Sequence, residues 1–247
     1  MAAKTSPRIN PKSVTILAMG PTTAQYIHRI GGQFERPTKH VWAINNAGMW
    51  FHDIDLIIAM DDFKRDSKTH PKYVKALTER GVPVLTCTAY DKYPSLEEYP
   101  IKEVLEYLGC YPEYTAPVFR DVFPTHHPLD NSCNYALAYA MYRGMKEIHL
   151  YGYEFRPRYS EATLMLAEKF AKEKYGPDVP GWFKFYMKDY MPHAQEPGET
   201  NCCWLLGVCR ERGINIQLAS GTTLLGHDLP RFYYGYQKQP EFSNEDI

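Results

Sequence analysis

The stretch Asn131-Ser-Cys-Asn-Tyr-Ala-Leu-Ala-Tyr-Ala-Met-Tyr-Arg-Gly-Met-Lys-Glu-Ile-His-Leu-Tyr-Gly-Tyr-Glu-Phe155 decides the fold, because a loop, a helix, a turn and a buried strand follow one another in it. Asn131 and Ser132 can accept hydrogen bonds from the first free amides of a helix. The small alanines that follow keep this helix thin enough to lie on a sheet. Gly144 stands where a left-handed C-cap is expected, and 147–151 has the pattern of a strand. The stretch therefore predicts one αβ unit of an α/β protein.

The same alternation of strand and helix patterns runs through the rest of the chain. Apolar runs of strand length are found at 13–19, 41–45, 55–60, 82–87, 147–151 and 214–218. Helical patterns are found after Thr22, at 70–80, 101–108 and 161–175, and at 199–212. Buried strands that alternate with helices are typical of a parallel sheet. We therefore predict an α/β fold with a doubly wound, Rossmann-like parallel sheet.

The breakers and polar ends of the chain predict its domain organisation. We expect a single Rossmann-like α/β domain over 13–236, with a small aromatic-rich lid inserted at about 156–198. The polar residues 1–12 predict a disordered lead-in, and 237–247 a loose tail. Residues 88–125, rich in Tyr and Pro, are interpreted as an irregular connection that contains the helix at 101–108.

Composition narrows the class of protein. The formal net charge of −1 gives no strong global field, so nucleic acid is not indicated as a partner, although a local basic groove is not excluded. The six cysteines form no Cys-x-x-Cys pair and no signal-peptide pattern precedes them, which favours free thiols in the cytoplasm. No apolar run is long enough for a membrane span. Nothing in the composition opposes a homo-oligomer.

Polar and Gly-bearing loops collect after the predicted strands. Because ligands of open α/β sheets bind outside the carboxyl ends of the strands, these loops predict one nucleotide crevice. The alternatives are glycines needed only for tight turns and asparagines that make Asx turns. The loop after the first strand is neither a Walker loop nor a full Gly-x-Gly-x-x-Gly motif. The candidate nucleotide-binding residues are Gly20, Pro21, Thr22, Asn45, Asn46, Asn131, Ser132, Gly152 and Glu154.

Adjacent carboxylates follow the third strand. Asp61 and Asp62 could hold Mg²⁺ on a diphosphate, since Mg²⁺ prefers one or two carboxylates together with phosphate oxygens. Equally, they could cap the next turn. His126 and His127 point in different directions on an extended chain and do not make a metal pair.

The sequence also resembles a known group of proteins. Gly20-Pro-Thr22 is similar to the strand–Gly-Pro-Ser start of bacterial CMP-sialic-acid-dependent sialyltransferases (glycosyltransferase family 42) and of the 6-hydroxymethylpterin diphosphokinase-like proteins. Asn45 falls where those proteins have an Asn after the second strand. In the central stretch Ser132, Gly152 and Glu154 match, with Glu in place of Asp, whereas Cys133 replaces a Gly of the family pattern.

The resemblance implies roles for three further residues. In the sialyltransferases a His before the final helix is the general base, and His193 stands at the comparable place. Of the paired Tyr that act near the leaving phosphate, only Tyr159 has a counterpart, and Arg156 is the candidate substitute. We therefore expect a nucleotide-dependent transferase, first of all a glycosyltransferase with a CMP-sugar-like donor and an unspecified acceptor. The alternatives are a Mg²⁺-dependent pterin-type diphosphokinase with ATP, and a non-catalytic nucleotide-binding module.

Overall fold

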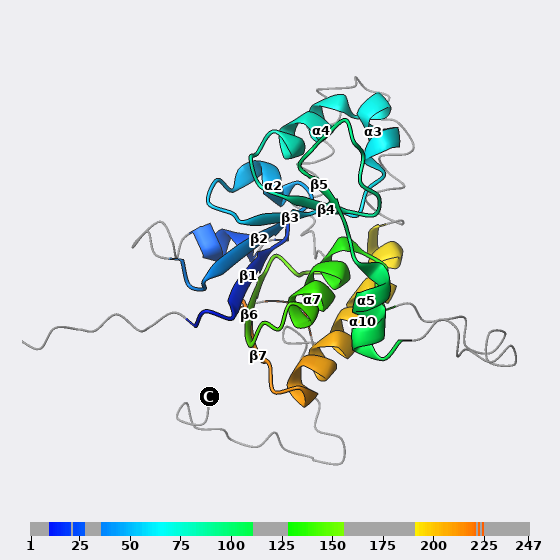
Figure 1. The fold of residues 1–247 in the computed structure, drawn as a ribbon. Helices are drawn as coiled ribbons and strands as arrows, with labels where there is room; N and C mark the ends of the chain where they lie inside the picture. The colour runs from blue at the N-terminus through cyan, green and yellow to red at the C-terminus, as the bar shows by residue number, and fades with distance from the viewer. Residues whose placement is uncertain are drawn as a thin grey trace, which may run out of the picture.

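The computed structural model describes residues 10–20, 22–27, 36–110, 128–155, 191–220, 222 and 224, and within 191–197 it describes the backbone only. Among these residues the core is a seven-stranded sheet in the order β5-β4-β3-β2-β1-β6-β7 (Figure 1). All neighbouring strands run parallel. The strands are β1 Ser13–Leu17, β2 His40–Ile44, β3 Leu56–Ile58, β4 Val84–Thr86, β5 Leu96–Glu98, β6 Glu147–Tyr151 and β7 Asn215–Leu218.

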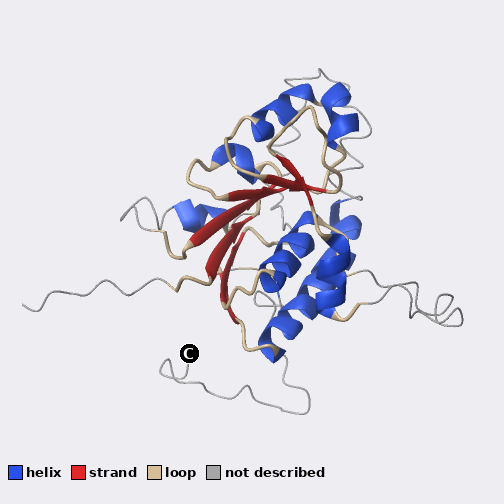
Figure 2. Cartoon of the chain, viewed as in Figure 1, coloured by secondary structure: helices blue, strands red, loops and turns tan. Residues whose placement is uncertain are grey.

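Helices cover both faces of this sheet (Figure 2). Apolar side chains of α5, α7 and α10 form one core with the strands, whereas α2, α3 and α4 contribute to a second core on the other face. A helical turn at 23–27 joins the second core through Tyr26. The helices are α2 Ala47–Trp50, α3 Phe63–Thr69, α4 Pro71–Thr78, α5 Ile101–Leu108, α7 Ser132–Tyr142 and α10 Met191–Glu211. The prediction of a doubly wound, Rossmann-like α/β fold is thus confirmed.

The central strand is buried on both faces, as its sequence predicts. All five residues of β1 are buried, because β2 and β6 flank it and helices cover it on each side. Val14 and Ile16 point into one core and Leu17 into the other. By contrast, β7 pairs with β6 at the end of the sheet and has no fully buried residue.

The predicted αβ unit forms as its sequence indicates. Asn131 caps α7 by accepting a hydrogen bond from the backbone amide of Asn134 at 3.1 Å. Gly144 ends the helix with a φ of 72°, and β6 follows. The predicted helices at 70–80 and 101–108 are likewise present as α4 and α5.

Some elements differ from the sequence prediction. β5 lies in the segment interpreted as an irregular connection and has one buried residue in three, and the short helices α2 and α3 lie where no helix was predicted. The structure describes α10 from Met191, ahead of the predicted start at 199, and the helix as described includes Pro192 and Pro197.

Other predictions fall outside the described residues. They concern residues 1–9 of the lead-in, the lid apart from 191–198, and the tail at 237–247. They also concern the part of the irregular connection that follows residue 110. Over the described part of the chain, no helix combines the length and the apolar character that crossing a bilayer demands.

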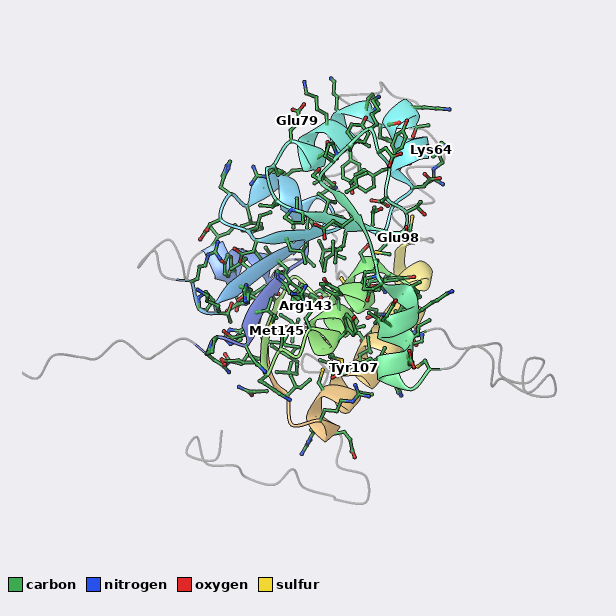
Figure 3. The ribbon with its side chains drawn as sticks, viewed as in Figure 1. Lys64, Glu79, Glu98, Tyr107, Arg143 and Met145 are labelled. Carbon is green, nitrogen blue, oxygen red and sulfur yellow. The ribbon has the colours of Figure 1, made fainter. Side chains whose placement is uncertain are left out.

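Two arginines that follow helices contact tyrosine rings. Both lie near the amino ends of the strands that come next in the chain. Arg143, after α7, lies over the ring of Tyr139 and donates to its hydroxyl at 2.8 Å. Arg212, after α10, lies 4.4 Å from the ring centre of Tyr107 on α5. Figure 3 labels Arg143 and Tyr107 at these helix ends. Cations are favourable there because the carbonyl end of a helix carries partial negative charge.

Leu137 tests the core beneath α7. Its side chain is completely buried, so Leu137→Ala should lower the free energy of unfolding by about 2–5 kcal/mol, measured by urea denaturation. Lys102→Ala on the exposed face of α5 is the control and should change it by less than about 0.5 kcal/mol. Equal midpoints for the two variants would contradict the packing described.

Candidate functional site

The strand order changes direction at β1. From β1 the chain builds β2 to β5 on one side and then returns to add β6 and β7 on the other. Ligands of doubly wound sheets bind at such a switch point, outside the carboxyl ends of the strands. Because all strands are parallel, Gly20, Asn45, Asp61 and Gly152 follow their strands at this same edge. These residues thus share one edge of the sheet, and the binding of a ligand there stays a prediction.

The loops after β1 and β6 touch through their backbones. The amide of Ala18 donates to the carbonyl of Tyr151 at 2.9 Å, and that of Gly20 to the carbonyl of Gly152 at 3.0 Å. A Cβ at Gly20 would lie 2.6 Å from the Gly152 oxygen. Gly152 has a φ of 77°, and a Cβ there would lie 2.5 Å from the oxygen of Ala18. Both glycines are therefore needed for the contact between the two loops.

The carboxylate of Glu154 lies at the start of the helical turn at 23–27. One of its oxygens accepts from the Thr22 amide at 3.2 Å, and the other accepts from the Thr22 hydroxyl. The same hydroxyl accepts from the Gly152 amide at 2.8 Å. The first amides of a helix attract an anion, and here Glu154 supplies one. A ligand phosphate at this turn has to compete with that carboxylate. Pro21 lies outside the described residues.

The first turn of α7 reaches the same edge. Its Cys133 carbonyl accepts from the Tyr153 hydroxyl at 3.1 Å, which fixes the turn beside the loop after β6. Ser132 is the first residue of the helix, and Asn131 is its cap. The structure thus brings Gly20, Thr22, Gly152 and Glu154 into contact and places Asn131 and Ser132 on the adjoining helix.

A polar cluster that the sequence reading missed joins α7 to α10. The side-chain amide of Asn134 donates to Asp130 at 2.7 Å and to the Gly198 carbonyl at 3.0 Å. Asn201 donates to the other oxygen of Asp130 at 3.0 Å. The signal available in the sequence was Asn134, a polar residue inside an otherwise small and apolar helix. This cluster anchors the early part of α10 at the carboxyl edge of the sheet.

Asn45 combines an unusual backbone with an unpaired side-chain oxygen. It has a φ of 49°, the only positive φ of a non-glycine residue in the described part of the chain. Its Oδ1 is buried and has no hydrogen-bond donor among these residues. Neither Asn45 nor its exposed neighbour Asn46 caps α2 through its side chain. The alternative that Asn45 makes an Asx turn therefore finds no support in its contacts.

The two carboxylates after β3 have partners within the protein. Asp62 caps α3 by accepting from the Arg65 amide at 3.0 Å. Asp61 accepts from the Tyr73 hydroxyl at 2.7 Å, and burial together with this bond raises the pKa of Tyr73. The capping alternative thus holds for Asp62. Within the described ranges, no group of three or more His, Cys, Asp or Glu side chains is arranged to hold a metal ion.

Cys133, in the first turn of α7, is not an activated thiol. Burial raises the pKa of Cys133 to about 12, and the nearby carboxylates of Glu154 and Asp130 add to the shift. At neutral pH the sulfur is therefore protonated. Because the thiolate is the nucleophilic form, this environment does not suit covalent catalysis by Cys133.

The structure describes none of the side chains of the predicted catalytic residues. Arg156 and Tyr159 lie outside the described residues, as do His126 and His127. The backbone of His193 belongs to α10, but its side chain is not described.

Comparison with known proteins gives no relative from which to transfer a role. No family model, no curated protein and no solved structure matches the chain.

Alanine substitutions at two glycines with similar φ values can distinguish the cost of backbone strain from the cost of a steric clash. A Cβ at Gly144 would meet nothing within 4 Å, so Gly144→Ala should cost about 1–2 kcal/mol for the left-handed backbone alone. Gly152→Ala adds a collision with the β1 loop and should lose on the order of 2–5 kcal/mol in total. Urea denaturation measures both. Equal losses would mean that the two loops are not in contact.

Proposed function

We propose that the chain is a nucleotide-dependent transferase whose donor binds at the β1–β6 switch point, and specifically a glycosyltransferase that uses a CMP-sugar-like donor. The observation that carries the proposal is Asn45. A buried acceptor without a donor costs about 1–3 kcal/mol, and the left-handed backbone adds to that cost. Such a residue at the ligand-binding edge of a doubly wound sheet is accounted for by a ligand that donates a hydrogen bond to it.

A nucleotide fits this edge because its base and ribose can donate hydrogen bonds and its phosphate can accept them. An amino group of the base or a ribose hydroxyl can donate to Asn45, and Glu154 and Ser132 offer further acceptors for ribose hydroxyls. The start of α7 provides backbone amides for phosphate, whereas a phosphate at the 23–27 turn has to compete with the Glu154 carboxylate. Asn46 and Asn131 lie next to these groups and complete the proposed binding set.

The transfer step follows from the polarity of a nucleotide-sugar donor. An acceptor hydroxyl attacks the anomeric carbon, and the bond from that carbon to the phosphate oxygen breaks. The nucleotide leaves with the electron pair. His193 takes the proton of the attacking hydroxyl, for which an ordinary imidazole pKa near ~6.5 is suited. Arg156 and Tyr159 offset the charge that develops on the leaving phosphate.

The diphosphokinase alternative ranks lower because its metal ligands have other partners. Asp62 caps α3 and Asp61 accepts from Tyr73. A panel of CMP, UDP, GDP, ATP and CMP-sugars, each with and without Mg²⁺, distinguishes the alternatives by thermal shift. A ligand at 100 times its Kd stabilises the protein by about 2.7 kcal/mol. Stabilisation by ATP that depends on Mg²⁺ would favour the diphosphokinase. Binding of CMP-sugar without any turnover would favour the non-catalytic module.

Asn45→Gly tests the nucleotide site. Glycine keeps the left-handed backbone without strain, and the substitution removes the unpaired oxygen. The variant should therefore be at least as stable as the parent in urea, yet bind CMP roughly tenfold or more weakly by calorimetry, because about 1.4 kcal/mol is lost. Asn215→Gly, at the exposed first residue of β7, is the matched control and should leave CMP affinity unchanged. Unchanged CMP affinity in Asn45→Gly would remove the main support for the proposal.

His193→Ala tests the general base. Turnover, measured as CMP release from a CMP-sugar, should fall by roughly 10²–10⁴-fold while CMP affinity stays the same. The parent rate should also decline as the pH falls through the imidazole pKa, because the protonated ring cannot accept a proton. His70→Ala, at the exposed junction of α3 and α4, is the control. Full turnover in His193→Ala would mean that another group is the base.

A further inference from the structure

A pocket of about 260 Å³ lies beside the switch point, between the ends of β6 and β7 and the helical turn at 23–27. No role has been given to it so far. It is lined by Gln25, Tyr151, Gln217, Leu218, Ala219 and Ser220.

The walls of this pocket are held by hydrogen bonds. The Ala219 amide donates to the Leu150 carbonyl at 3.2 Å, which continues the β6–β7 pairing beyond the strands. The side-chain amide of Gln25 donates to the Ser220 carbonyl and ties the helical turn to the end of β7. Tyr151 is fixed by its ring contact with Tyr26, with centroids 5.5 Å apart. The pocket is therefore built by the sheet and does not depend on one loose side chain.

The lining determines which chemistry the pocket can bind. None of the described residues that line it has a charged side chain. The amide nitrogen of Gln25 is used on Ser220, and that of Gln217 faces a Glu147 oxygen at 3.4 Å. The carboxamide oxygens of both glutamines have no donor in the part of the chain that the structure describes, and they are acceptors. A neutral ligand rich in hydroxyl donors suits them, whereas a phosphate or carboxylate would find no cation.

The size and position of the pocket narrow the ligand further. Its volume lies below the ~300–1,000 Å³ of sites for drug-sized ligands, so one small ring suits it better than a longer chain. Tyr151 in its lining directly precedes Gly152, whose amide donates to Thr22 in the candidate nucleotide site at 2.8 Å. The pocket and the nucleotide site thus share the carboxyl end of β6.

We propose that this pocket is the acceptor subsite and that it takes one uncharged sugar ring, whose hydroxyls donate to the oxygens of Gln25 and Gln217. The assignment of the ring as acceptor rests on the proposed function. The binding of a neutral sugar at this place is a separate property and can be measured without turnover.

Saturation-transfer NMR on the full chain tests the subsite. The probes are glucose, galactose and N-acetylglucosamine at millimolar concentration, with glucose 6-phosphate and glucuronate as charged counterparts. Gln217→Met removes one acceptor oxygen at nearly constant size. Asn215→Ala is the matched control, because Asn215 is an exposed carboxamide on the same strand and does not line the pocket. CMP affinity is measured by calorimetry on every variant.

We expect at least one neutral sugar to receive saturation, at least a fivefold loss of sugar affinity in Gln217→Met, and parent-like behaviour in Asn215→Ala. CMP affinity should be the same in all three proteins. If no neutral sugar binds, if Gln217→Met binds like the parent, or if the charged sugars bind more tightly, the subsite is wrong even when CMP binds. If CMP does not bind but a neutral sugar does, the nucleotide proposal fails and the sugar site stands.

Discussion

The direct backbone contact between the loops after β1 and β6 is the constraint on which the site depends. The two strands continue to pair after they leave the regular sheet, through Ala18 with Tyr151 and Gly20 with Gly152. Side chains at the two glycines would push the loops apart. With the loops in contact, Thr22 lies within hydrogen-bond distance of Glu154 and Gly152. These bonds fix the start of the 23–27 turn at the switch point. The most conspicuous glycines of the sequence therefore serve the protein's own packing before they serve a ligand.

Glu154 places a negative charge of the protein itself at the start of the 23–27 turn. An unoccupied helix start attracts anions without regard to their shape. Glu154 already accepts from the amide and the hydroxyl of Thr22 at the turn after β1. The start of α7 likewise has a carboxylate beside it, that of Asp130, which accepts from the side-chain amide of Asn134. Both helix starts therefore have an anionic side chain of the protein's own close by.

Local patterns in the sequence predicted the elements that are stabilised locally. β1 and β6 are short runs dominated by strand-forming and apolar residues, and α7 carries its own cap and its own terminating Gly144, so all three were predictable. β5 was not, because main-chain pairing with β4 gives it its conformation and Leu96 alone is buried. In the site, Gly20, Asn45 and Glu154 were found from their position after strands. The cluster of Asp130, Asn134 and Asn201 was missed because it forms only when α10 packs on α7.

The order of the strands also decides when the site can exist during synthesis. Thr22 and Glu154 are 132 positions apart in the chain, and Gln25 and Ser220 are 195 positions apart. Chains emerge from the ribosome N-terminus first, so β1 to β5 leave it well before β6 and β7. In that interval β1 is an open edge with an unpaired row of backbone groups, which is a template for wrong pairing. Closing such distant contacts is slow, and the contact between the loops after β1 and β6 is therefore among the last parts of the domain to form.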